Sequence, residues 1–261
     1  LRKAIILRKI TPLVICKSPE EIDIMKRSGA ILAELLQELR GFIRPGITTL
    51  DIDAFAEEFI TSRGAYPSFK GLYGFPASAC VSVNEEVVHG IPGERKLTEG
   101  DIVSIDVGAQ VEGFHCDSAM TFPVGRVSNQ AMALMTATEQ SLYEGIEQAR
   151  IGMRIADISR AIQSHAESKG FSIVKVLSGH GVGRKLHEEP AIPNFVIRGE
   201  PGPVLVEGVT LAIEPMVNLG GPDVKTLNDN WTVVTCDGSL SAHFEHTVAV
   251  TQEGPVVLTA L

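Results

Sequence analysis

Four acidic residues interrupt segments that otherwise have the composition of buried β-strands. They are Asp106 within residues 102–108, Asp117 within 114–119, Glu214 within 211–217 and Glu245 within 243–250. A charged carboxylate among apolar side chains is costly unless it is paired or bound to a metal. A single one is commonly an ion-pair partner or faces solvent. Four of them, in segments with few Lys or Arg residues, predict converging carboxylates that need a divalent cation.

Three histidines could add imidazole groups to such a site. His180 lies in the Gly-rich segment 179–183, which we expect to form a turn, His187 follows seven residues later, and His89 precedes a Gly-Ile-Pro sequence. The Gly-rich turn lacks the Lys-Ser/Thr pair of a phosphate-binding loop. Carboxylates mixed with imidazole suit Mn, Fe, Co or Zn better than Mg or Ca. If some carboxylates bridge, the set has the composition of a two-metal hydrolytic site, with metals roughly 3.5–4 Å apart.

The elements that must position these residues begin with two pairs of helices. The sequence Ser18-Pro19-Glu20-Glu21 is a capping box with proline at the first helical position, and the apolar stripe that follows it ends at Gly41. A second helix is expected over about 48–64. The other pair is predicted over about 128–149, capped by Ser128, and over about 154–169.

Strand-like runs follow each helix pair, over residues 79–84, 101–110, 113–122, 171–177, 209–217, 231–237 and 242–251. This order predicts an α+β domain of two similar halves, with helices over one face of a mostly antiparallel sheet. A cleft between the halves is a natural ligand site. A hairpin that turns near residues 110–112 would bring Asp106 and Asp117 to one sheet face, because alternate strand residues share a face.

Composition narrows the function classes. The 261 residues are 44% hydrophobic and 21% charged with a net charge of −9, which is typical of a globular protein and provides no general attraction for nucleic acid or an anionic membrane. Four scattered cysteines form no CxxC pair and are expected to be free thiols. The basic, apolar residues 1–15 are expected to form a leading strand or a frayed end. We divide the chain into an N-terminal extension, 1–17, and a catalytic domain, 18–261.

Several motifs together resemble the type I methionine aminopeptidases, which are metallopeptidases of the pita-bread fold. The matching stretches are residues 80–92, 101–108, 179–183 with 187–190, 211–215 and 244–247, and the resemblance runs from about Ser18 to the C-terminus. It implies a curved antiparallel sheet covered by two helix pairs. It also implies two divalent ions (Co, Mn, Fe or Zn) bound by Asp106, Asp117, His180, Glu214 and Glu245.

The resemblance also implies roles for these residues. Asp117 and Glu245 would bridge the ions, Glu214 would additionally shuttle a proton, and hydroxide would attack the first peptide bond. His187 would stabilise the oxyanion and His89 would contact the scissile nitrogen, so both would touch substrate. The reaction is removal of an N-terminal methionine that precedes a small residue.

By this resemblance, four residues match positions of the family's methionine pocket: Phe75, Cys80, Leu186 and Trp231. Two departures stand out, because Leu186 replaces an expected aromatic residue and Cys116 precedes Asp117 where glycine is common. The resemblance further implies a monovalent cation near Asn84 and Ser241.

The resemblance makes nascent polypeptides the expected partners, with the ribosome nearby, and implies a cytoplasmic monomer. Two alternatives remain open. A proline-specific peptidase shares the ligand set but usually carries a large extra N-terminal domain, whereas only 17 residues precede the first capped helix here. A binding protein that lost catalysis would lack ligands, and all five are present. A type II enzyme would need a helical insertion for which this chain has no room.

Overall fold

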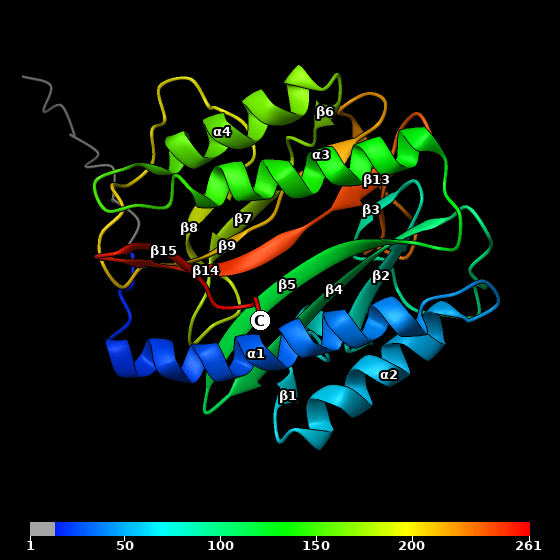
Figure 1. Ribbon diagram of the computed structural model, residues 1–261, viewed down its shortest axis with the longest axis horizontal. Helices are drawn as coiled ribbons and strands as arrows, with labels where there is room; N and C mark the ends of the chain where they lie inside the picture. The colour runs from blue at the N-terminus through cyan, green and yellow to red at the C-terminus, as the bar shows by residue number, and fades with distance from the viewer. Residues whose placement is uncertain (1–13) are drawn as a thin grey trace, which may run out of the picture.

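The structure is a computed structural model that describes residues 14–261, so the expectation for residues 1–15 falls almost entirely outside the described part. Figure 1 shows two pairs of helices lying along a long curved sheet. In the described chain the α-helices are α1 (Pro19–Phe42), α2 (Thr49–Ser62), α3 (Asn129–Ile146) and α4 (Ile155–Ser168). A short 3-10 turn, η1, spans Leu72–Gly74.

The main sheet has nine strands in the order β1-β4-β5-β14-β9-β7-β8, with β15 paired to β14 and β2 paired to β4. Every one of these pairs is antiparallel. The strands are β1 (Tyr66–Pro67), β2 (Ala79–Val83), β4 (Ile102–Val111), β5 (Phe114–Pro123), β7 (Ser178–Gly181), β8 (Glu188–Pro193), β9 (Thr210–Ile213), β14 (Glu245–Thr251) and β15 (Gly254–Val257).

Two small antiparallel sheets flank the main one. The first has the order β13-β10-β6 and the second β11-β12-β3. Their strands are β3 (Glu86–Val88), β6 (Ser172–Ile173), β10 (Met216–Asn218), β11 (Val224–Thr226), β12 (Val233–Thr235) and β13 (Ser241–His243).

The predicted helices form where their caps and apolar stripes place them. Ser18 and Thr48 each accept a backbone N–H three residues on, and the carboxylates of Glu21 and Asp51 accept the cap N–H in return. The side chain of Ser128 caps α3 in the same way, without the return bond. These bonds satisfy donors that the first helical turn leaves free.

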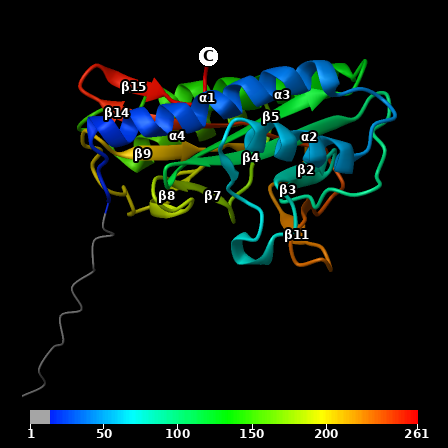
Figure 2. The same cartoon turned by 90° about the horizontal axis from the view of Figure 1, so that it is seen from below.

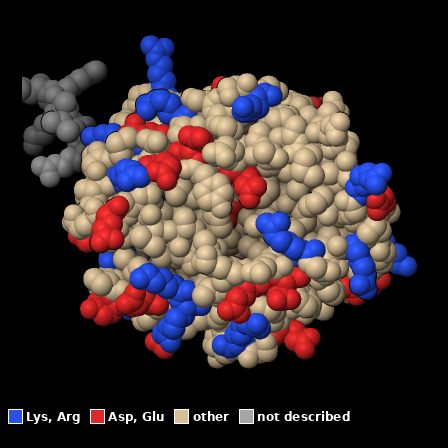
Figure 3. All heavy atoms as spheres, viewed as in Figure 1, with Lys and Arg blue, Asp and Glu red and all other residues tan. Residues whose placement is uncertain are grey.

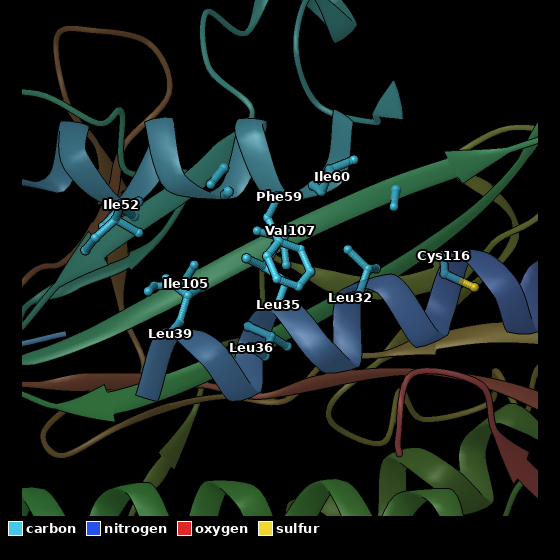
Figure 4. Close-up of a cluster of buried hydrophobic side chains, with 14 of the residues drawn as sticks. Leu32, Leu35, Leu36, Leu39, Ile52, Phe59, Ile60, Ile105, Val107 and Cys116 are labelled. Carbon is cyan, nitrogen blue, oxygen red and sulfur yellow. The ribbon is translucent and has the colours of Figure 1, made fainter. Parts of the chain in front are cut away.

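Each helix pair covers its own half of the sheet with a separate core. The α1–α2 core includes Leu32, Leu35 and Leu39 from α1, all fully buried, against Ile105 and Val107 of β4 (Figure 4). The second core packs α3 and α4 against β9, β13 and β14. Figure 2 shows the four α-helices on one side of the sheet. Loops and short strands lie on the other side. The predicted α+β architecture of two similar halves is confirmed.

The hairpin β4–β5 has the expected register. Asp106 pairs with Ala119 and Gly108 with Asp117, so both carboxylates lie on the face opposite the α1–α2 core. The turn comes at Glu112 and Gly113, slightly later than expected, and both residues have positive φ. Glycine adopts this backbone region at little cost.

Two expected strands are each broken in two beside an acidic residue. Residues 209–217 divide into β9 and β10 around Glu214-Pro215, and residues 242–251 divide into β13 and β14 at Phe244. Proline has no N–H for the ladder. At this point the Phe244 amide donates to the Pro215 carbonyl, at 3.4 Å. The two segments thus leave the main sheet together and pair again as β10 and β13.

Other expected strands are shorter than predicted: β6 keeps two residues of 171–177 and β12 three of 231–237. The Gly-rich segment 179–183, expected as a turn, is instead largely strand β7. The glycines allow β7 to approach its neighbouring strands closely. A Cβ at Gly179 would overlap the Ala212 carbonyl, and a Cβ at Gly181 would overlap the Glu189 carbonyl.

On the helix-covered face, acidic and basic side chains are intermixed (Figure 3). None of the helices within residues 14–261 combines the length and the apolar character needed to cross a bilayer.

Candidate metal centre

A cavity of about 360 Å³ contains all five predicted ligands in its lining. Asp106 comes from β4, Asp117 from β5, His180 from β7 and Glu245 from the first residue of β14, while Glu214 follows β9 at the strand break. Adjacent strands of one sheet therefore bring together residues that span 139 positions of the sequence. The antiparallel register places them on one face.

The closest part of this cluster is formed by Asp117, His180 and Glu245, which each offer a ligand atom within 4.8 Å of the other two. The Nε2 atom of His180 lies 3.8 Å from Oδ2 of Asp117 and 3.6 Å from Oε1 of Glu214. Its Nδ1 atom lies 2.9 Å from the Gly181 carbonyl and donates to it. This bond leaves Nε2 as the unprotonated atom that faces the carboxylates, as a metal-ligating histidine requires.

The four carboxyl groups of the cluster are buried close together, and both their burial and their mutual repulsion disfavour the ionised form. Burial raises the pKa of Asp106 to about 7 and that of Glu214 to about 8. Burial and the neighbouring Asp106 raise the pKa of Asp117 well above its usual range, and burial together with Asp117 does so for Glu245. Burial lowers the pKa of His180 to about 4. The raised pKa values of the four carboxyl groups show that the described residues provide little positive charge to offset the charge of this cluster.

The cluster fits divalent cations by its donor set. Among the described residues, one oxygen each of Asp106, Asp117 and Glu245 is buried without a hydrogen-bond partner. No Lys or Arg stands among the described residues that line the cavity. Buried polar atoms are almost always paired. Unpaired carboxylate oxygens beside an imidazole are suitable ligands for Mn, Fe, Co or Zn, which would satisfy these oxygens.

The two other predicted histidines, His89 and His187, also line the cavity. The ring of His187 is 4.5 Å from that of His180, edge to face, and stacks on Tyr73 at 6.0 Å. His89 has a positive φ and its ring lies 6.5 Å from that of Trp231. Burial lowers the pKa of His89 to about 4 and also lowers the pKa of His187. Both imidazoles are therefore neutral at pH 7.

Next to the cluster, the four predicted pocket residues form one apolar wall. Phe75, Cys80 and Leu186 are buried in a small cluster of their own, against which Trp231 packs. The rings of Phe75 and Trp231 meet edge to face at 5.1 Å. All four line the same cavity as the carboxylates. The structure thus joins an apolar wall to a cluster of metal-ligand groups in one cavity.

Comparison with known proteins agrees with this geometry. A family model described as metallopeptidase family M24 matches residues 23–252. The methionine aminopeptidase of Clostridium perfringens is 55% identical over 249 residues, which cover 95% of this chain and 100% of that protein. The chain belongs to the methionine aminopeptidases of metallopeptidase family M24.

Solved structures support the same fold. The crystal structure of methionine aminopeptidase from Thermotoga maritima has a TM-score of 0.93 and 44% identity, over 95% of this chain and 100% of that one. The Xaa-Pro dipeptidase of Bacillus anthracis has a TM-score of 0.74 at 22% identity, and this chain covers 61% of it. The latter likeness shows the shared fold alone.

Two departures from the family pattern have clear places in the structure. Leu186 still packs into the pocket wall, where it is 4% exposed. Cys116 is fully buried, and its thiol donates to the Met25 carbonyl of α1 at 3.1 Å. It therefore lies in the α1–α2 core (Figure 4), on the side of the sheet away from the carboxylates.

Sequence reasoning missed one residue at this aminopeptidase-family site. Tyr73 is 77% exposed beside His187, in a loop whose flanking Gly71 and Gly74 have positive φ. Two glycines three positions apart among aromatic residues were the available signal. His243, fully buried at the end of β13, places Nε2 3.6 Å from Oε2 of Glu214. The sequence pattern places His243 on the same strand face as Glu245, and the break between β13 and β14 brings it beside Glu214.

Proposed function

We propose that this protein removes the N-terminal methionine from polypeptides whose second residue is small, by metal-dependent hydrolysis of the first peptide bond. The observation that carries the proposal is the direct adjacency of the apolar pocket to the five ligand groups. A methionine side chain in the pocket would present its amino group and first carbonyl to the cluster. Relatives with 55% identity that are named methionine aminopeptidase support the reaction.

Asp106, Asp117, His180, Glu214 and Glu245 would hold two divalent ions, with Asp117 and Glu245 shared between them. When bound, the ions would supply hydroxide at neutral pH and Lewis acidity at the carbonyl. Mn, Fe, Co and Zn all suit this donor set. We also propose a monovalent cation near Asn84 and Ser241, whose backbones lie side by side, since the Ser241 amide donates to the Asn84 carbonyl at 2.9 Å.

The chain's own residues divide the work of proton transfer and positioning. Glu214, which lines the cavity beside the other ligand groups, would accept a proton as an ionised carboxylate and return it to the leaving nitrogen. His187 would donate a hydrogen bond to the developing oxyanion. His89 would contact the scissile nitrogen. Phe75, Cys80, Leu186 and Trp231 would hold the methionine side chain and exclude larger ones.

The surroundings of the reaction belong to the proposal as well. We infer nascent chains as substrates, action near the ribosome in the cytoplasm, a monomeric state, and no direct role for nucleic acid or membrane binding. The catalytic domain would span 18–261, with 1–17 as an extension. The identity to methionine aminopeptidases, against 22% to a dipeptidase of the same fold, favours methionine over a proline-directed substrate.

A peptide assay tests the function directly. The protein is stripped with chelator, reloaded with Mn, Fe, Co or Zn, and offered peptides that begin Met-Gly, Met-Lys or Ala-Pro. We expect metal-dependent release of methionine from Met-Gly alone. Cleavage of Ala-Pro would make it a proline peptidase. Absence of cleavage with every metal, in protein shown to bind two ions, would favour a binding protein.

A further inference from the structure

A fully buried ion pair joins the segment before α1 to the turn that carries His187. The Nζ atom of Lys17 lies 2.6 Å from Oε2 of Glu188, and the two side chains are 3% and 4% exposed. They are 171 residues apart in the sequence. Of the ion pairs between Lys or Arg and a carboxylate in the described chain, this is the one with both partners buried.

Both partners are fixed by further contacts. Lys17 also donates to the Ile15 carbonyl from Nζ, at 3.1 Å, and to the Gly208 carbonyl from its backbone, at 2.7 Å. The other oxygen of Glu188 accepts the Lys185 amide at 3.1 Å. The ion pair therefore closes the turn 182–187 against the main body of the sheet.

The turn is shaped to admit the lysine. A Cβ at Gly183 would overlap Cε of Lys17 and would also approach Nζ and the Glu188 carboxylate. Glycine at this position thus leaves the space that the lysine stem occupies. The Gly183 carbonyl accepts the His115 amide at 2.8 Å, which ties the same turn to β5.

The residues held by this arrangement line the cavity that contains the ligand groups. His187 immediately precedes Glu188, and Leu186 of the apolar pocket precedes His187. At the other end of the turn, Gly181 pairs with Glu188 and follows the ligand His180. The side chain of His187 makes no hydrogen bond among the described residues, and its ring contacts are to His180 and Tyr73. Its position therefore depends on its backbone.

We propose that the Lys17–Glu188 ion pair is a positioning device for His187, so that the segment before α1 contributes to catalysis. The inference rests on the proposed role of His187. A displacement of about 1 Å far from the reacting atoms can cost as much as a hundredfold in rate. Breaking a buried pair also destabilises the fold because one charge stays unpaired, whereas neutralising both partners does not leave a charge.

The test uses the variant Lys17→Met/Glu188→Gln in the full chain. Glutamine keeps an acceptor for the Lys185 amide, and methionine fills the lysine stem's space. We expect a melting temperature and a bound-metal content close to wild type, with an unchanged KM for Met-Gly peptide. We expect kcat to fall by about tenfold to a hundredfold. The control Arg63→Met/Glu34→Gln neutralises a half-exposed pair and should leave kcat unchanged.

A double-mutant cycle with His187→Ala makes the test specific. In that background, neutralising the pair should change kcat by less than about twofold, because the residue it positions is already gone. Wild-type kcat in the Lys17→Met/Glu188→Gln variant would overturn the inference, and so would an undiminished effect in the His187→Ala background. Full activity of His187→Ala itself would instead refute the proposed role of His187, and with it this inference.

Discussion

The carboxylate of Glu214 lies between two imidazoles, with Oε1 3.6 Å from Nε2 of His180 and Oε2 3.6 Å from Nε2 of His243. His180 belongs to the ligand cluster. His243 lies deeper, and its Nε2 has no hydrogen-bond partner among the described residues. A proton on that nitrogen would point at Glu214 and orient it. Groups that orient metal ligands in this way contribute strongly to metal affinity and to activity.

Replacing His243 by leucine should therefore loosen Glu214. We expect Mn²⁺ affinity to fall by about tenfold to a hundredfold, with a comparable loss in kcat. His243→Gln keeps an amide donor and should recover much of both. Calorimetric titration of chelator-treated protein with Mn²⁺ measures affinity separately from activity. Wild-type affinity in the leucine variant would show that His243 fills space only.

The stability of the metal-free protein should fall as pH rises from 6.5 to 8. Asp106 and Glu214 have pKa values of about 7 and 8 in the folded state, raised by burial from 3.8 and 4.5. The folded protein thus binds more protons than the unfolded chain, and its stability decreases as those protons leave. The contribution of these two groups to the unfolding free energy should decrease by roughly 2–3 kcal/mol across this window.

The opposing effect of histidine is small in this window. Burial lowers the pKa of His89, His180 and His246 from 6.5 to about 4, so their contribution to stability increases with pH up to 6.5 and levels off within about one unit above it. Urea unfolding in the presence of chelator, at pH 6.5, 7.2 and 8, measures the trend. Metal-loaded protein, whose carboxylates stay ionised, should not follow it. A flat profile in chelator would contradict the uncompensated cluster.

Enlarging the apolar pocket should relax side-chain discrimination. Leu186→Ala removes a buried wall residue, so we expect kcat/KM for Met-Gly to fall about tenfold, while Phe-Gly and Leu-Gly peptides become relatively better substrates. The measurement is kcat/KM for each peptide at saturating metal. Leu227→Ala, at a residue that is 41% exposed and lines no part of this cavity, is the matched control. Unchanged relative rates would remove Leu186 from the pocket.

Two glycine substitutions should have opposite effects. Gly181→Ala would force β7 and β8 apart, because its Cβ overlaps the Glu189 carbonyl, and overpacking typically costs about 1–3 kcal/mol. The shift would also move His180 and weaken metal binding. Gly41→Ala in α1 meets no atom within 4 Å and should stabilise by roughly 0.5–1 kcal/mol. Thermal melts with and without Mn²⁺ compare the two. Equal effects would contradict the strand-approach explanation.

The sequence predicted those features that depend on local chemistry. Capping residues predicted the helix starts at Ser18, Thr48 and Ser128, and strand alternation placed Asp106 and Asp117 on one face. Resemblance supplied the set of five residues that the structure brings into one cavity.

What could not be predicted depends on contacts between distant segments. The glycines of β7 suggested a turn in the sequence. In the structure they allow neighbouring strands to pack closely and do not reverse the chain. The break at Pro215 became visible only with its partner Phe244, from another strand. β8 lacks a simple apolar alternation, so its pairing with β7 gave no local signal.

The spread of the ligands over separate strands has a consequence for how the chain is held together. An ion shared by Asp106 and Glu245 would close a loop of 139 residues. A cross-link over such a span restricts the unfolded chain strongly, as a disulfide does. Here the cross-link would be made from carboxylates and would open whenever the ion is withdrawn. The described cysteines are all free, so no disulfide supplies such a cross-link in the described chain. The supply of metal would therefore affect the stability of the fold as well as catalysis.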